Sequence, residues 1–80
     1  MRSVLFENNA LNDFTNWANE NKKTFDRIVK LLDETRRTPF MGTGKPEALK
    51  HNLNGHWSRR ITDEHRLVYK VTEDLIIGLV

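Results

Sequence analysis

The sequence predicts an α+β fold in which two N-terminal helices pack on one face of an antiparallel, twisted sheet of about five strands. Two observations lead to this expectation. Apolar residues recur at helical spacing through the first half of the chain, and apolar and polar residues alternate between turn signals in the second half. The 80 residues suffice for one hydrophobic core, so we expect a single domain over residues 1–80.

The N-terminal half predicts a short strand followed by two helices. Residues 2–6 are mostly apolar and favour a strand. Asn8 or Asn9 is a suitable N-cap for a helix near residues 9–19, and the helical period returns near residues 22–36. Thr38-Pro39 should end the second helix, because a residue that precedes proline disfavours the helical conformation.

The C-terminal half predicts strands and turns after an ordered loop over residues 38–46. Candidate strands cover residues 48–53, 57–62, 66–72 and 75–80. Three-residue loops at 54–56 and 63–65 would sort apolar and cationic side chains onto opposite faces. The expected partners are Leu53 with Trp57, Leu49 with Ile61, Lys50 with Arg60, Ile61 with Leu67, and Arg60 with Val68. One face would then lie under the helices, and the other would be open and positively charged.

The open face carries the candidate chemistry. Lys50, Arg60 and Arg66 are expected there on neighbouring strands, and a phosphodiester site would explain why like charges gather. Glu47 enters at the start of this cluster, where a lone carboxylate among cations can act as a general base. Alternatively, Glu47 is a salt-bridge partner of Lys50 or Arg60. Arg59 and His51 fall on the apolar side, near its edge, with their polar tips reaching solvent.

The charge is distributed unevenly along the chain. Residues 36–70 carry eight Lys and Arg against three Asp and Glu, whereas residues 1–35 carry five against six. A basic half on a small domain indicates a polyanionic partner, with nucleic acid first, although solvated surface charge explains the same composition. A DNA-binding protein is a weaker alternative, because the basic residues lie on strands and no helix-turn-helix or zinc pattern is present.

Several classes of site do not fit this sequence. The chain has no cysteine, which excludes disulfides and thiolate chemistry. Its three histidines, His51, His56 and His65, lack further ligands at suitable spacing, and Ser58 has no His–Asp pair to activate it. We therefore expect neither a metal nor another cofactor. The start of the chain does not resemble a secretory signal and no segment predicts a membrane span, so we expect a cytoplasmic protein without a membrane partner.

A family resemblance rests on three segments. They are RRTPF at residues 36–40, GTGKPEALKHNL at 42–53 and GHWSRRITDEHRLVY at 55–69. These segments closely resemble the YoeB/Txe family of RelE-type bacterial toxins, and the resemblance extends over the whole chain. It implies a microbial-RNase-like fold and a ribosome-dependent mRNA interferase that is neutralised by a YefM-type antitoxin. The implied partners are this antitoxin, the ribosome and mRNA. The resemblance is also compatible with a homodimer.

The resemblance also implies roles for individual residues. Glu47 corresponds to the general base and Arg66 to the arginine that stabilises the transition-state phosphate. Lys50 and Arg60 correspond to cationic residues around the scissile group. The implied reaction is metal-free: the 2′-hydroxyl attacks phosphorus and leaves a 2′,3′-cyclic phosphate and a 5′-hydroxyl. RNA contacts are expected from His51, Arg59, Lys45 and Ser58.

The sequence departs from the family at its C-terminal end. Family members close in His-Tyr, and that histidine is the general acid. This chain ends at Gly78-Leu79-Val80, and none of its three histidines corresponds to the general acid. We therefore expect either an endoribonuclease that cleaves more slowly than its family or, as the alternative, a toxin-like module that binds antitoxin or ribosome without cutting.

Overall fold

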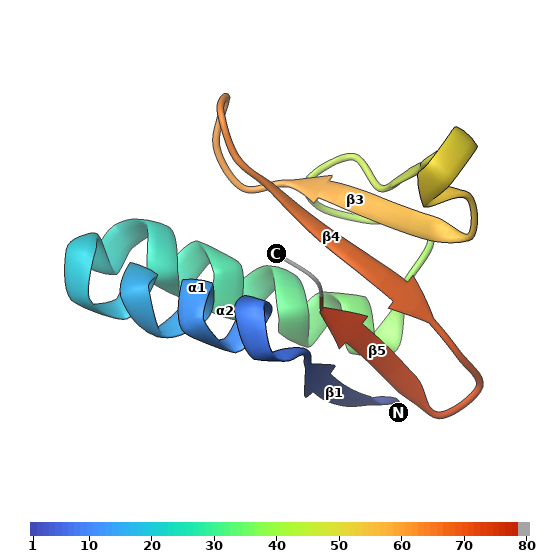
Figure 1. Cartoon of the computed structure of the whole chain (residues 1–80), viewed down its shortest axis with the longest axis horizontal. Coiled ribbons are helices and arrows are strands. Elements are labelled where there is room, and N and C mark those ends of the chain that lie inside the picture. Colours follow the sequence, from blue (N-terminus) through green and yellow to red (C-terminus); the bar gives the residue numbers. More distant parts are fainter. Residues whose placement is uncertain (79–80) are drawn as a thin grey trace.

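The computed structural model describes residues 1–78, which form two α-helices and a five-stranded sheet (Figure 1). In chain order the elements are β1 (Ser3–Phe6), α1 (Asn8–Glu20), α2 (Lys22–Arg37), β2 (Glu47–Ala48), the 3₁₀-helix η1 (His51–Leu53), β3 (His56–Arg60), β4 (Arg66–Val71) and β5 (Leu75–Gly78). The strand order is β1-β5-β4-β3-β2. The predicted α+β class is confirmed, as are both helices. The last two residues of the predicted strand 75–80 lie outside the described residues.

Local sequence explains where the helices begin and end. The side chain of Asn21 accepts a hydrogen bond from the Thr24 amide at 3.1 Å and caps α2, which ends at Arg37 just before Thr38-Pro39. The predicted cap of α1 is wrong, because Asn8 and Asn9 are already helical and Glu7 precedes them without a side-chain cap. Helix α1 starts directly from the end of β1 because the Glu7 carbonyl accepts from the Leu11 amide at 2.9 Å. Neither of these helices is long and apolar enough to cross a membrane.

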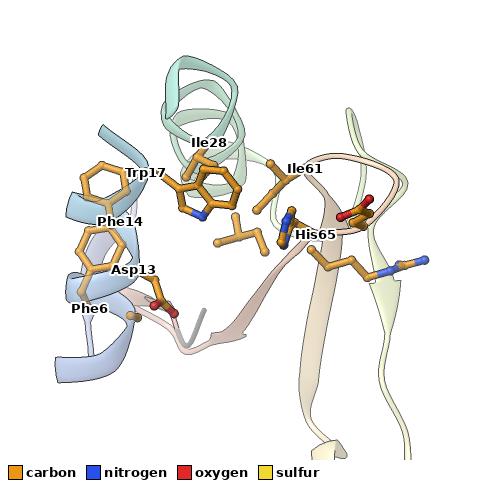
Figure 2. Close-up of a pocket in the computed structure, with 11 residues that line it drawn as sticks. Phe6, Asp13, Phe14, Trp17, Ile28, Ile61 and His65 are labelled. Atoms are coloured by element: carbon orange, nitrogen blue, oxygen red, sulfur yellow. The ribbon is translucent and has the colours of Figure 1, made fainter. Parts of the chain in front are cut away.

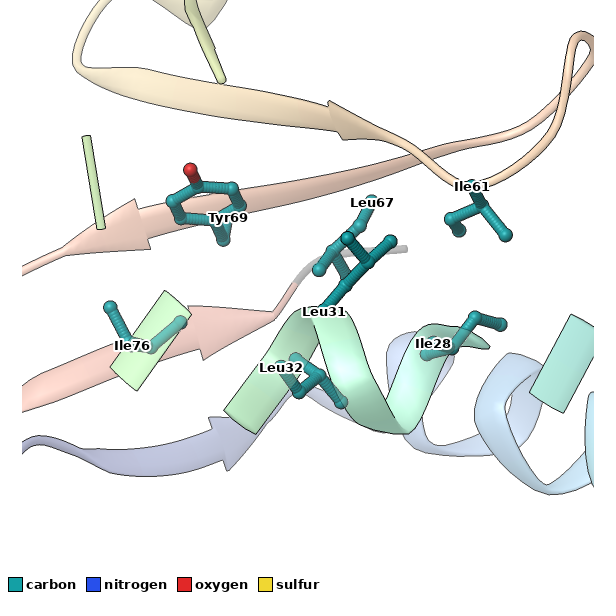
Figure 3. Close-up of a cluster of buried hydrophobic side chains, with 7 residues drawn as sticks. All are labelled: Ile28, Leu31, Leu32, Ile61, Leu67, Tyr69 and Ile76. Carbon is teal, nitrogen blue, oxygen red and sulfur yellow. The ribbon is translucent and has the colours of Figure 1, made fainter. Parts of the chain in front are cut away.

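The core lies between α2 and the sheet (Figure 3). Its buried members are Ile28, Leu31, Leu32, Ile61, Leu67, Tyr69 and Ile76. The residues from α2 follow helical spacing, and those from the strands alternate, so each element contributes one apolar face. The aromatic rings of Phe6, Phe14 and Phe25 also pack in sequence, at centroid distances of 4.9 Å.

The sheet is mixed rather than wholly antiparallel, which corrects the prediction. Strand β1 runs parallel to β5, with Val4 opposite Ile76, while the pairs β2–β3, β3–β4 and β4–β5 are antiparallel. A short turn determines the relative direction only of the two strands that it joins. Strand β1 is instead followed by two helices, which return the chain to the sheet in an orientation that turn residues do not determine.

The register of β3 and β4 sorts the faces as predicted but uses different partners. Arg60 lies opposite Arg66 and Arg59 opposite Leu67, instead of Ile61 opposite Leu67 and Arg60 opposite Val68. The connection is longer than three residues because the amides of Ile61 and Thr62 both bond to the His65 carbonyl. The cross-strand partners shift by two residues, so each side chain stays on its predicted face of the sheet. The apolar and cationic side chains therefore still separate.

The predicted strand 48–53 is largely wrong. Strand β2 ends at Ala48, which pairs with Trp57, and η1 follows instead of a tight hairpin. The pairs Leu53–Trp57, Leu49–Ile61 and Lys50–Arg60 therefore do not form. The reason is local: His51 has a φ of +61°, which interrupts an extended strand, and Leu53 is exposed and gains nothing from a sheet position.

Candidate active site

Glu47 and Arg66 meet on the face of the sheet away from the helices. A Glu47 carboxylate oxygen (Oε2) lies 3.6 Å from Nη1 of Arg66, and their side chains are 66% and 46% exposed. The predicted alternative of a Glu47 ion pair with Lys50 or Arg60 is not what the structure shows. An ion pair this exposed contributes only about 0–1 kcal/mol to stability. Its two charges therefore remain available to a ligand.

Ser58 forms the floor between these two charged residues. It is fully buried, lies directly opposite Glu47 across β2 and β3, and accepts a hydrogen bond from Nη1 of Arg66 at 3.4 Å. Its small side chain lets the acid and the cation approach each other above it. Ser58 was expected to contact RNA, but its burial corrects that expectation and makes it a support for Arg66.

A second cation adjoins the site. Arg60 and Arg66 are direct partners on β3 and β4, and both are exposed. Like charges placed opposite each other destabilise a strand pair, so this pairing is unfavourable unless an anion lies over it. The expected gathering of Arg60 and Arg66 on the open face is therefore observed as direct pairing.

The remaining predicted cations are less closely grouped. Lys50 precedes η1, and its expected pairing with Arg60 is absent because β2 has already ended. Lys45 and His51 are exposed and both have positive φ values, of 51° and 61°. Lys45 lies just before the strand that carries Glu47. The role of Lys50 around the scissile group and the RNA contacts of Lys45 and His51 stay predictions.

Arg59 is not available to RNA, which corrects that expectation as well. Its side chain is fully buried, and its guanidinium contacts the segment over residues 38–43 and Tyr69. The prediction placed it on the apolar face with its tip in solvent. The face is right, but the tip is enclosed by the loop that follows α2. Sequence patterns did not reveal the contacts of Tyr69 and Glu34 with this arginine, because both residues fit ordinary core and surface positions.

His56 and His65 make different contacts within the described residues. His56 Nδ1 lies 3.2 Å from the Leu53 carbonyl, and the ring of His65 packs edge-on against Trp17 at a centroid distance of 4.9 Å. Among residues 1–78, no group of three His, Cys, Asp or Glu side chains could hold a metal ion.

A cavity of about 220 Å³ opens beside Arg66 (Figure 2). Its walls include Phe6, Phe14, Trp17 and Ile28, and Asp13 and His65 stand among them. The cavity therefore has apolar walls and polar groups at the same end of β4 as the candidate site.

Known bacterial proteins resemble this sequence over nearly its whole length. Residues 6–79 match the family described as YoeB-like toxin of bacterial type II toxin-antitoxin system. Toxin YoeB of Escherichia coli K12 is 50% identical over 74 residues, which cover 92% of this chain and 88% of that protein. Toxin RelK of Mycobacterium tuberculosis is 53% identical over 79 residues, which cover 99% and 93%.

Solved structures show the same fold. A YoeB/ParE toxin from Agrobacterium tumefaciens has a TM-score of 0.93 at 35% identity, covering 96% of this chain and 92% of that one. The YoeB–YefM heterotetramer of Staphylococcus aureus contains a chain with a TM-score of 0.90 at 39% identity, covering 99% and 92%. The extent of the family match and the identity to curated relatives decide the assignment. The chain belongs to the YoeB-like toxin family of bacterial type II toxin–antitoxin systems.

Proposed function

We propose that this chain is a metal-independent endoribonuclease that cleaves translated mRNA on the ribosome and thereby inhibits translation. The observation that carries the proposal is the exposed contact between Glu47 and Arg66 above Ser58. A carboxylate beside a guanidinium provides a base and an anion-stabilising group at one point. Because the pair contributes little to folding, its position on an open face favours a role toward a ligand.

In the proposed reaction Glu47 removes the proton from a ribose 2′-hydroxyl. The 2′-oxygen then forms a bond to the adjacent phosphorus while the bond from phosphorus to the 5′-oxygen breaks. The 5′-oxygen takes up one proton as it leaves, so the products are a 2′,3′-cyclic phosphate and a 5′-hydroxyl. We assign that last proton to no described residue.

The cations would act on the phosphate. Arg66 can donate to a nonbridging oxygen as negative charge accumulates in the transition state, and Arg60 lies opposite it to share that charge. Lys50 would be a further cation around the scissile group, and Lys45 and His51 would contact the RNA on either side. Ser58 keeps Arg66 in place beneath the phosphate.

Primer extension on a translated message tests this function. The wild-type chain should produce new 5′ ends only in the presence of translating ribosomes. Glu47→Gln should lower their yield by about 10²-fold, whereas Glu73→Gln, which makes the same charge change in the turn between β4 and β5, should leave it unchanged. Ribosome binding without new 5′ ends in the wild-type chain would instead favour the binding module that does not cut.

We also propose an acidic antitoxin of the YefM type as the partner that silences the toxin. Two features support it: the Staphylococcus aureus relatives form YoeB–YefM complexes, and the open face of this chain presents Arg60 and Arg66. An acidic segment that is disordered when free could fold across these cations. Its affinity should fall only partly as salt rises, because apolar contacts persist; complete loss at moderate salt would contradict this partner.

A homodimer is a further proposed assembly. A YoeB from Staphylococcus aureus was solved as a dimer, and this chain exposes Phe40 and Met41 at 50% and 67%. Apolar side chains this exposed favour an interface. Light scattering across a concentration series should detect a dimer, and a constant monomer mass would reject it.

A further inference from the structure

The buried guanidinium of Arg59 contacts the backbone of the loop over residues 38–43 and the side chains of Tyr69 and Glu34. Nε donates to the Tyr69 hydroxyl at 3.2 Å. Nη1 donates to the Thr43 carbonyl at 3.2 Å and lies 3.5 Å from Oε1 of Glu34. Nη2 donates to the carbonyl of Thr38 and to that of Met41, the latter at 2.9 Å. An arginine has five N–H groups in a fixed plane, and here the guanidinium makes four hydrogen bonds and lies beside the Glu34 carboxylate. A lysine could not reproduce this arrangement.

Two further side chains complete the arrangement. The Tyr69 hydroxyl donates to the Pro39 carbonyl at 2.7 Å, and the Glu34 carboxylate accepts from the Thr43 amide at 2.7 Å. Glu34, Arg59 and Tyr69 together, which we call the loop clamp, thus hold backbone groups of residues 38–43. These three side chains come from α2, β3 and β4, so the loop is tied to three elements at once.

The held segment leads directly into the candidate general base. The Arg60 amide donates to the Gly44 carbonyl at 2.8 Å, three residues before Glu47. Gly44 has a φ of +85°, and a Cβ there would lie only 3.1 Å from the Arg60 carbonyl oxygen. Glycine therefore permits close contact between the loop and β3. From this contact the chain has only Lys45 and Pro46 before it pairs as β2.

Strand β3 connects the clamp and the site because its side chains alternate between faces. Arg59 points to the loop, whereas Ser58 and Arg60 lie on the face of Glu47 and Arg66. A buried ion pair is weak evidence for stability, since well-packed apolar residues often stabilise as much. The particular result of this network is a fixed path for the loop.

We propose that Glu34, Arg59 and Tyr69 are positioning residues that place Glu47 against Arg66 by fixing the loop over residues 38–44. This inference rests on the proposed function of Glu47 for its consequence in catalysis. The clamp touches neither the reacting atoms nor the RNA. It acts through the backbone that carries the base.

Tyr69→Phe is the main test, because it removes one hydroxyl and keeps the buried ring. Thr35→Val is the matched control: Thr35 is also fully buried, and its hydroxyl donates to the Leu31 carbonyl at 2.6 Å within α2 rather than to a group of the loop. Single-turnover cleavage on saturating ribosomes should fall at least tenfold in Tyr69→Phe while ribosome affinity stays within twofold. Geometric misplacement of a catalytic group has effects of about this size or larger. Thr35→Val should retain the wild-type rate.

A second measurement does not depend on activity. Amide hydrogen exchange at Thr43 and Glu47, and the carbon-13 shift of the Glu47 carboxyl, should change in Tyr69→Phe and remain wild-type in Thr35→Val. Unchanged exchange and shift would overturn the clamp even if the protein cleaves RNA. If these signals change but the wild-type chain does not cleave, the proposed function fails while the clamp stands. Equal cleavage rates in the two variants would overturn the catalytic consequence.

Discussion

Arg59 and Arg60 are adjacent in β3, yet they lie in opposite environments. Arg59 is fully buried under the loop that follows α2, whereas Arg60 is exposed opposite Arg66 on the open face. The alternation of a strand alone produces this difference. Composition counts the two residues alike, but one is enclosed by the loop and the other faces solvent beside Arg66.

The first prediction separates stability from activity in two arginines. Arg59→Ala should lower the free energy of unfolding by about 3 kcal/mol or more, because it leaves buried carbonyls and Glu34 without their partner. Arg66→Ala should change it by less than about 1 kcal/mol, because an exposed ion pair contributes little, but should abolish cleavage. Urea unfolding and the cleavage assay measure both. Greater destabilisation by Arg66→Ala would show that the register assigned to β3 and β4 is wrong.

The second prediction concerns the base. Glu47→Gln keeps the size of the side chain and removes its ability to take a proton. The cleavage rate should fall by about 10²-fold, within the usual range for a general base, while thermal stability and ribosome affinity remain close to wild type. Pre-steady-state cleavage compared with Glu73→Gln provides the measurement. An unchanged rate would remove Glu47 from the mechanism.

Much of the fold could be predicted because side-chain periodicity determines it. The helices follow from apolar residues at helical spacing, and the two faces of β3 and β4 follow from alternation. The parallel pairing of β1 with β5 could not, since no short turn joins those strands. Strand β2 also escaped prediction: the left-handed conformation of His51 ends the extended run where the pattern alone favours a strand.

The site was predictable in part for the same reason. Arg60 and Arg66 both occupy strand positions whose side chains point to the open face. Their proximity therefore follows from alternation even when the strand partners shift by two residues. The burial of Arg59 depends on a loop that wraps over the covered face, and no periodic signal describes a loop. Glu47 reaches the open face because β2 pairs with β3 in a register that the expected hairpin did not give.

The third prediction is a pH dependence of stability. Hydrogen bonds from Thr43, and then the charge of Arg59, hold the pKa of Glu34 below its ordinary value of 4.5, although partial burial opposes them. The folded state therefore binds this proton less readily than the unfolded state. The stabilisation is present above pH 4.5 and is lost as the pH falls through the lowered pKa. Urea unfolding of wild type and Glu34→Gln should differ most near neutral pH and converge in acid; parallel profiles would contradict this assignment.

The fourth prediction concerns the core and its control. Leu31 is 1% exposed at the centre of the cluster in Figure 3, and Leu11 is 48% exposed on α1. Leu31→Ala should destabilise the protein by about 2–5 kcal/mol through lost burial and the cavity left behind. Leu11→Ala should cost less than about 0.5 kcal/mol, as surface changes usually do. Similar midpoints of thermal unfolding for the two variants would show that the helices do not pack as described.

The last prediction concerns the floor of the site. Ser58 is fully buried between Glu47 and Val68, and its hydroxyl is 3.4 Å from Arg66. Ser58→Ala removes only this long hydrogen bond, so cleavage should fall by less than about tenfold, in keeping with a net bond energy near 1 kcal/mol. Ser58→Val adds volume where none is free, which should cost about 1–3 kcal/mol of stability.

The larger side chain should also separate the acid from the cation above it. Cleavage by Ser58→Val should therefore fall well below that of Ser58→Ala at a temperature where both variants are folded. Circular dichroism establishes the folded fraction, and single-turnover rates on the same message give the comparison. If Ser58→Val cleaves as fast as Ser58→Ala, the spacing of Glu47 and Arg66 does not depend on a small residue beneath them, and the contact between the two is not the reacting geometry.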